Sequence, residues 1–270
     1  MNFKIFIINL DESIERMNRI QGELERLKLH FERISAVNGK NLDESQILKH
    51  YSPKLNRKKY FVPLSKAEIG CYMSHLKVCE KIVSENLDYA IVFEDDISIK
   101  EGFSLIPNVL DSIKEKWDYI KLISPGREKK IIQRKTVFAN VPAKISYEKW
   151  SKDKNAFENS QEPRAIEIPL AFELVKWEKP PVGTSAYAIS RDGAKEFLSK
   201  RSKFFRPIDV DLQYYWETNL NVLGLLPQCV KLIKDKSTIQ NQKPKYHYPL
   251  ARLIYKIKFF TLFRSKNKHE

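Results

Sequence analysis

The sequence predicts an α/β fold built around a mainly parallel sheet, and two observations lead to this prediction. Residues 3–10 and 89–93 are runs of apolar residues, which is the pattern of strands buried on both faces. Each run adjoins a segment whose apolar residues recur with the period of a helix. The chain has 270 residues, of which 42% are hydrophobic, so it is long enough to bury a full core around such a sheet.

The first 40 residues have the order strand, helix, strand. Residues 3–10 form the first strand, and Asp11 or Ser13 can cap the helix that follows. The inner face of this helix carries Met17, Ile20, Leu24 and Leu27. Residues 31–37 then form a second strand that ends at a turn signal, Asn-Gly, which completes a βαβ unit.

The later elements follow the same order as far as about residue 125. A helix over about 65–85 leads into the strand at 89–93, and a helix near 104–115 leads into a strand near 119–123. Residues 125–169 have no clear period, so we expect an insertion or a mobile loop over a site. A strand over 183–190 and a helix over about 191–200 come next.

Three consecutive carboxylates, Glu94, Asp95 and Asp96, directly follow the strand at 89–93. In open α/β sheets, ligands bind at this end of the strands. Adjacent carboxylates repel one another, and a hard divalent cation such as Mn²⁺ or Mg²⁺ would neutralise them. The ligand class that brings such an ion is a phosphate or a diphosphate. The alternative is that these acids cap a helix or lie in a solvated turn.

The three cysteines, Cys71, Cys79 and Cys229, form no disulfide framework and fit a reducing compartment. Cys71, His75 and Cys79 recur every four residues along a helix, which raises the question of a zinc site. At about 1.5 Å per residue, the two cysteines are roughly 12 Å apart along the axis, which is too far for one zinc ion. We interpret both as core thiols.

The formal net charge of +14 predicts an acidic partner: nucleic acid, anionic lipid or a phosphorylated glycan. Basic and aromatic residues alternate through 243–270, which we expect to be a tail on a single domain over 1–242. If 249–263 is helical, Leu250, Leu253, Ile254 and Ile257 form one apolar stripe. This pattern is typical of a helix on an anionic membrane. The alternative is that the stripe packs on the protein's own core.

We expect a cytoplasmic protein that contacts a membrane only at its surface. The sequence has no run of about 18 apolar residues that could span a bilayer, and its first apolar run is too short for a signal peptide.

Six groups of residues, taken together, resemble glycosyltransferase family 25, which includes bacterial lipooligosaccharide glycosyltransferases and collagen galactosyltransferases. They are 8–11 with Arg16, 31–39, 67–71 with Ser74 and His75, 90–96, 183–184 with 187–190, Gly193 and Ala194, and 207–209. They occur in the family's order over about residues 5–212. The stretch 125–169 and the tail are not covered by this resemblance.

The resemblance implies a GT-A-like nucleotide-sugar-binding domain with a mixed, mostly parallel central sheet and helices on both faces. It also implies an inverting transfer of a hexose from a UDP-sugar, dependent on a divalent metal. We favour galactose over glucose and Mn²⁺ over Mg²⁺. The implied acceptor is a lipid-linked oligosaccharide, a lipooligosaccharide or lipopolysaccharide, at the inner face of a bacterial inner membrane.

In this interpretation Asp96 is the main metal ligand. Glu94 is a second ligand, or shares with Asp95 the roles of orienting the metal's water shell and binding ribose. Asp209 occupies the family's Pro-x-Asp position and ranks first as general base, with a sugar-hydroxyl or metal contact as its competing role. Asp211 ranks second, because an acid in the first turn of a helix can simply stabilise the helix dipole.

The remaining candidates have weaker signals. Donor-site candidates are Asn9, Asp11, Arg16, Glu68, His75 and Tyr187, and His247 is a candidate metal or diphosphate ligand. Asp11 could instead be a helix cap, His75 a satisfied core histidine and Tyr187 a core aromatic residue.

Two other function classes compete with a glycosyltransferase. A non-catalytic protein could bind anionic lipid or nucleic acid through its basic surface, but no nucleic-acid-binding motif is found, so we expect no nucleic-acid partner. Another metal-dependent phosphoryl or nucleotidyl transferase would also use paired carboxylates. Only eight glycines are present and no P-loop or kinase pattern appears, which argues against that class.

Overall fold

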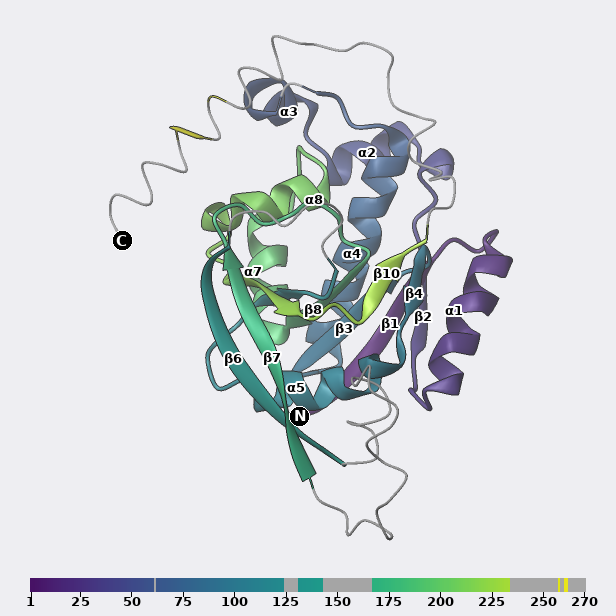
Figure 1. The fold of residues 1–270 in the computed structure, drawn as a ribbon. Helices are drawn as coiled ribbons and strands as arrows, with labels where there is room; N and C mark the ends of the chain where they lie inside the picture. Colours follow the sequence, from purple (N-terminus) through teal and green to yellow (C-terminus); the bar gives the residue numbers. More distant parts are fainter. Residues whose placement is uncertain (61, 124–130, 143–166, 234–256, 258–259, 262–270) are drawn as a thin grey trace, which may run out of the picture.

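The computed structural model describes residues 1–60, 62–123, 131–142, 167–233, 257 and 260–261 (Figure 1). Its strands are β1 (Phe3–Asn9), β2 (Glu32–Ser35), β3 (Tyr89–Glu94), β4 (Ile97–Ile99), β5 (Tyr119–Lys121), β6 (Ile131–Pro142), β7 (Glu167–Trp177), β8 (Ala186–Ser190), β9 (Val222–Leu226) and β10 (Val230–Leu232). Its α-helices are α1 (Ile14–Arg26), α2 (Glu44–His50), α3 (Pro53–Lys59), α4 (Lys66–Ser84), α5 (Ile106–Ser112), α7 (Arg191–Lys200) and α8 (Ile208–Asp211).

The central sheet has eight strands in the order β2-β1-β3-β8-β5-β9-β7-β6. Strands β2, β1 and β3 are parallel to one another, and β8 runs antiparallel between β3 and β5. Strand β9 is parallel to β5, and β7 is antiparallel to both β9 and β6. All strands except β8 and β7 therefore run in the same direction, which confirms the expected mixed, mostly parallel sheet.

Helices cover both faces of the sheet, which explains why β1 is apolar along most of its length. Ile5 and Ile7 point into a core that includes α1 and α5. Phe6 and Ile8, on the other face of the same strand, pack with α4 and α7. The strand has period 2, so both sets of side chains must be apolar when both faces are covered. Figure 1 shows α1 beside β1 and β2 at one edge of the molecule.

Helix α4, which carries the predicted pocket-facing residues, begins at a capping box. The Ser65 side chain accepts from the Glu68 backbone N–H, and the Glu68 carboxylate accepts from the Ser65 N–H at 2.8 Å. This pairing satisfies two amide groups that a helix start leaves without partners. It also corrects the prediction for Glu68, whose carboxylate caps the helix instead of contacting a donor.

Glycines allow α4 to approach the loop at 36–40. A Cβ atom added to Gly70 would lie 2.4 Å from the carbonyl oxygen of Val37, and one added to Gly39 would lie 2.0 Å from that of Lys66. Real Cβ atoms do not come this close to a backbone oxygen. Neither position can therefore accept a larger residue unless the helix and the loop separate.

We expect Gly70→Ala to lower the free energy of unfolding by about 1–3 kcal/mol, because its methyl group overlaps the loop. Gly22→Ala is the matched control. Gly22 is also inside a helix, α1, but a Cβ there meets nothing within 4 Å. It should raise stability by about 1 kcal/mol. Urea unfolding of both variants measures the difference, and equal effects would contradict the close approach.

Several regions differ from the expected pattern, among them β4, β9 and β10, which were not predicted. The stretch 125–169 contributes β6 and the start of β7, which pair from Ile131 opposite Trp177 to Pro142 opposite Glu167. Residues 143–166 lie outside the described residues. Helices α2 and α3 were not predicted. Of the tail at 243–270, only residues 257, 260 and 261 are described. The described helices include none with the length and apolar character needed to cross a membrane.

Candidate active site

A cavity of about 360 Å³ opens at the carboxyl ends of β1, β2 and β3. Four segments line it: the start of α1 with the residues before it, the loop at 36–40, one face of α4, and the acidic triplet Glu94–Asp96. The triplet therefore lies where ligands bind in sheets of this kind, as predicted from its position after a buried strand.

Asp95 is hydrogen-bonded by other side chains of the protein. Its carboxylate accepts from Asn9 Nδ2 at 2.7 Å and from Arg16 at 3.2 Å, and Arg19 bonds its carbonyl oxygen at 2.8 Å. Asn9 is 2% exposed, and its own amide oxygen accepts from Arg33. Asn9 thus ties the end of β1 to the triplet and does not line the cavity, contrary to its predicted donor contact. Arg16 does line the cavity.

Asp11 lies outside the cavity and joins two strand ends. Its carboxylate accepts from the Arg33 guanidinium and, at 2.9 Å, from the Ser35 hydroxyl. The bond from Arg33 is the main reason that the pKa of Asp11 is lowered. Ser13, not Asp11, occupies the cap position of α1. The structure therefore gives Asp11 neither of its two predicted roles.

Glu94 ends a chain of buried polar contacts. Its Oε1 accepts from the Thr184 hydroxyl at 2.6 Å and lies 3.3 Å from His75 Nε2. His75 Nδ1 lies 2.8 Å from the Tyr187 hydroxyl. Burial opposes the charge on Glu94, but the bonds with His75 and Thr184 outweigh it and lower the pKa of Glu94. Glu94 is therefore ionised at neutral pH.

Tyr187 is a core residue. It is 2% exposed and stacks on Tyr119 with ring centroids 4.6 Å apart. This corrects its predicted role in donor binding, since the ring has no surface on the cavity. Its hydroxyl instead orients the ring of His75, which does line the cavity.

Asp96 has the properties expected of a metal ligand. Burial, followed by the charges of Glu94 and Asp95, raises its pKa to about 6. In the described part of the chain, no donor bonds its buried Oδ1 atom. An unpaired buried carboxylate oxygen is costly unless a cation or a proton satisfies it. The residues present therefore fit a divalent cation.

A short segment before β8 joins Asp209 to the acidic triplet. The Gly183 N–H donates to Asp209 Oδ2 at 3.3 Å, the Thr184 hydroxyl bonds Glu94, and the Ser185 carbonyl accepts from the Glu94 N–H at 2.9 Å. Gly183 has φ 94°, a left-handed conformation that favours glycine. The Gly-Thr pair at 183–184 was noted in the sequence, but its bridging role was not.

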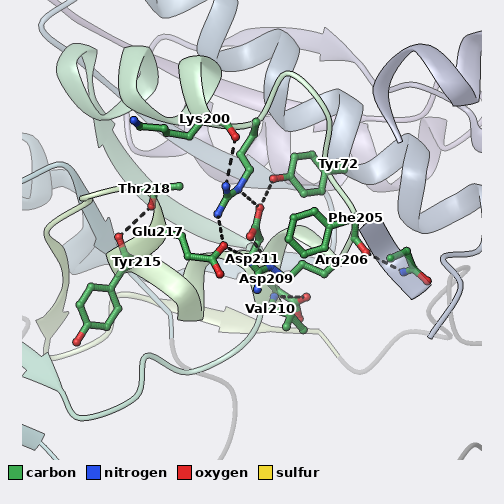
Figure 2. A network of polar contacts seen from close by, with 12 residues as sticks. Tyr72, Lys200, Phe205, Arg206, Asp209, Val210, Asp211, Tyr215, Glu217 and Thr218 are labelled. Carbon is green, nitrogen blue, oxygen red and sulfur yellow. Dashed lines mark hydrogen bonds and ion pairs between the residues drawn. The ribbon is translucent and has the colours of Figure 1, made fainter. Parts of the chain in front are cut away.

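Asp211 lies at the centre of a buried ionic network (Figure 2). Arg206 Nε donates to its Oδ1 at 2.6 Å, and Arg201 Nε donates to its Oδ2 at 2.6 Å. The Tyr72 hydroxyl also bonds Oδ2, and Asp211 is 2% exposed. A general base must reach a substrate proton with a free lone pair. Asp211 cannot do so, and the prediction that it is an alternative base is wrong.

The sequence interpretation did not assign Cys71 and Lys121 to the site, but the structure places Cys71 in its wall and Lys121 against the segment at 183–185. Cys71, interpreted as a core thiol, is partly exposed and lines the cavity. Lys121 is 3% exposed in β5, and its ammonium group bonds the Gly183 carbonyl oxygen. A lysine within an apolar strand was the available signal for Lys121. His247 lies outside the described residues.

Comparison with known proteins identifies the family. The model described as "Glycosyltransferase family 25 (LPS biosynthesis protein)" matches residues 2–212. The chain belongs to glycosyltransferase family 25. This match confirms the resemblance noted from the sequence, and it includes the cavity, the acidic triplet and Asp209.

The relatives within family 25 are much longer proteins. Procollagen galactosyltransferase 1-A of Xenopus laevis is 30% identical over 126 residues, which cover 44% of this chain and 21% of the relative. The inactive glycosyltransferase 25 family member 3 of Mus musculus is 30% identical over 160 residues, which cover 55% of this chain and 26% of the relative. The chain thus spans about a quarter of the length of these relatives.

A solved structure, the Drosophila β-1,4-galactosyltransferase 7 in complex with manganese, UDP-Gal and xylobiose, covers 93% of this chain and 74% of its own. It is 10% identical, with a TM-score of 0.35, which is too low for one structure to inform the other.

Proposed function

We propose that this member of family 25 is an inverting, metal-dependent glycosyltransferase that uses a UDP-sugar. The observation that carries the proposal is the buried Asp96 Oδ1 atom in an acid-lined cavity, for which the described residues provide no hydrogen-bond donor. A nucleotide sugar leaves as a diphosphate, and such a leaving group requires stabilisation of its developing negative charge. The cavity provides a position for the cation that would accompany it.

Asp96 and Glu94 are the proposed metal ligands, with Mn²⁺ preferred and Mg²⁺ as the alternative. A bound cation would neutralise the diphosphate without proton transfer. Asp95 is not a proposed ligand. Its carboxylate accepts from Asn9 and Arg16, and these bonds fix the backbone of the acidic triplet next to the metal position. Arg16 lines the cavity as well, so its guanidinium is placed to contact an anionic group of the donor.

Asp209 is the proposed general base. It is partly exposed, and it accepts from backbone N–H groups of Gly183 and Val210. Inversion requires one base on the face opposite the leaving group. The segment at 183–185 bonds both Asp209 and Glu94, so it fixes the position of the proposed base relative to the proposed metal site.

The proposed sugar is galactose, with glucose as the alternative, because several relatives are named procollagen galactosyltransferases. The proposed acceptor is a lipooligosaccharide or lipopolysaccharide, in line with the family description as an LPS biosynthesis protein. Some family members are named inactive, so turnover, and not nucleotide binding, is the decisive measurement.

The test is release of UDP and transfer of sugar from a panel of UDP-sugars, with Mn²⁺, Mg²⁺ or EDTA. We expect one sugar to be turned over, with activity lost in EDTA. Turnover in EDTA would support the proposed glycosyltransferase activity but would exclude its dependence on a metal. Binding without turnover of any UDP-sugar would indicate a member that keeps the donor site without catalysis.

The tail at 243–270 is the proposed membrane contact, on the inner face of a bacterial inner membrane, and 1–242 is the proposed catalytic domain. Deleting residues 250–270 should weaken binding to anionic vesicles at least about tenfold, because each basic residue near such a surface contributes about 1 kcal/mol. Turnover of a soluble acceptor should be retained. Neutral vesicles are the control. If the deleted protein still binds anionic vesicles, the tail is not the membrane contact and has a structural role only.

A further inference from the structure

Three potential ligand atoms of different chemistry meet at the edge of the cavity. One atom each from Cys71, His75 and Glu94 lies within 4.8 Å of the others. Cys71 and His75 are four residues apart on α4 and therefore share one face of that helix. Glu94, at the end of β3, faces them with its Oε1 atom 3.3 Å from His75 Nε2.

We propose that Cys71, His75 and Glu94 form a binding site for a zinc-type divalent cation, beside the proposed Mn²⁺ position at Asp96. A thiolate, an imidazole and a carboxylate are together a zinc ligand set. Mn²⁺ and Mg²⁺ prefer oxygen ligands, so the thiolate distinguishes the two positions. The zinc arrangement rejected from the sequence paired Cys71 with Cys79; in the fold, Glu94 takes the place of the second cysteine.

The neighbours of these ligands already hold them in position. The Tyr187 hydroxyl bonds His75 Nδ1 and the Thr184 hydroxyl bonds Glu94. A tyrosine hydroxyl can donate or accept. His75 can therefore carry its proton at Nε2 and donate to Glu94 when no metal is bound, or carry it at Nδ1 and donate to Tyr187, which leaves a lone pair at Nε2 for a cation. Such outer contacts, which orient a ligating histidine, are typical of zinc sites.

The site would be open on one side. All three ligands line the cavity, so a fourth position is available to water or to an anionic ligand, as in zinc sites that keep an open position. Binding releases the thiol proton of Cys71 to solvent, because the thiolate is the ligand form. On the proposed function, a bound zinc ion would also lower turnover, since it holds the Glu94 carboxylate.

The chain contains matched controls for the thiol. Cys79 and Cys229 are 2% and 5% exposed and lie in the core. Neither lines the cavity. Replacing them by serine changes the number of thiols without removing a proposed ligand.

The test is titration of the full chain with Co²⁺, whose bond to a thiolate gives a charge-transfer band in the near ultraviolet. We expect the band to saturate at one thiolate-bound Co²⁺ per chain, with this Co²⁺ displaced by Zn²⁺ and retained in excess Mg²⁺. Cys71→Ser should abolish the band, whereas the Cys79→Ser/Cys229→Ser double variant should keep it. Tyr187→Phe should weaken Co²⁺ binding by about tenfold or more, because it loses the contact that orients His75.

Absence of the band in the wild-type chain would overturn the proposal, as would a band that persists in Cys71→Ser. Circular dichroism of each variant separates loss of the site from loss of the fold, and the double variant tests the site where Cys71→Ser does not fold. Asp96→Asn should keep the Co²⁺ band while it loses turnover. Both proposals use Glu94, but the Co²⁺ band reports on the zinc site and turnover reports on the proposed glycosyl transfer, so the failure of one can be told from the failure of the other.

Discussion

Asp96→Asn is expected to reduce sugar transfer by at least about 10²–10³-fold, the usual effect of removing one group that stabilises transition-state charge. Asparagine has nearly the same shape as aspartate but lacks the charge that would hold a divalent cation. The measurement is UDP release and product formation at saturating Mn²⁺ with the sugar that the wild type turns over. Asp192→Asn, at an exposed carboxylate in α7, is the control and should be without effect.

The same substitution should stabilise the metal-free protein. The pKa of Asp96 is raised from 3.8 to about 6 in the folded state. A raised pKa means that the folded chain holds the proton more tightly than the unfolded chain, so stability falls as pH rises through this range. Asp96→Asn should therefore gain up to about 3 kcal/mol above about pH 6 and little below pH 4.

Urea unfolding of wild type and variant in EDTA, at pH 4 and pH 7, measures this gain. Adding Mn²⁺ should stabilise only the wild type, by mass action on the folded state. A variant that loses both activity and stability would show Asp96 to be a structural residue. Full activity in the variant would exclude Asp96 as the metal ligand.

Asp211→Ala is expected to lower the free energy of unfolding by about 3–5 kcal/mol, the usual cost of breaking a buried ion pair from one side. The two guanidinium groups that it neutralises belong to Arg206 and Arg201, which are 2% and 6% exposed. Without Asp211, only Glu217 remains of the two carboxylates that bond both arginines. Urea unfolding at pH 7 measures the loss.

Two variants test the assignment of the network. Tyr72→Phe removes a single hydrogen bond to Asp211 and should cost about 1 kcal/mol. Asp209→Asn, two residues away, should leave stability nearly unchanged and abolish transfer, because Asp209 is the proposed base. If Asp211→Ala were stable but inactive, and Asp209→Asn unstable but active, the roles given to the two aspartates would be reversed.

The elements that were predicted have strong periodic signals. Helix α1 buries Met17, Ile20 and Leu24 at helical spacing, and α4 starts at a capping box. Strand β6 alternates poorly, since most side chains from Ile132 to Thr136 are polar and exposed. Helix α2 is seven residues long and buries none of them. Such elements depend on their neighbours for stability and leave little pattern in the sequence.

The sequence predicted where the site lies, but only some of the residues that form it. The acidic triplet follows a buried strand, and that local pattern was sufficient to place it. The contacts that separate Asp95 from Asp96 come from elsewhere in the chain, since Arg16 is 79 residues from Asp95. The same is true of Glu94, whose partners are His75 and Thr184.

The sequence alone determined the family, the longer strands and helices of the first 120 residues and the place of the acids at a strand end, because these are recorded in local motifs and periodicity. Only the tertiary structure decided which acids are neutralised, which remain free, and that Cys71 meets Glu94. Two carboxylates that look alike in the sequence, Asp209 and Asp211, differ because, among the described residues, two arginines pair with Asp211 and none pairs with Asp209. Burial and charge pairing are properties of contacts between distant segments, and these contacts exist only once the chain has folded.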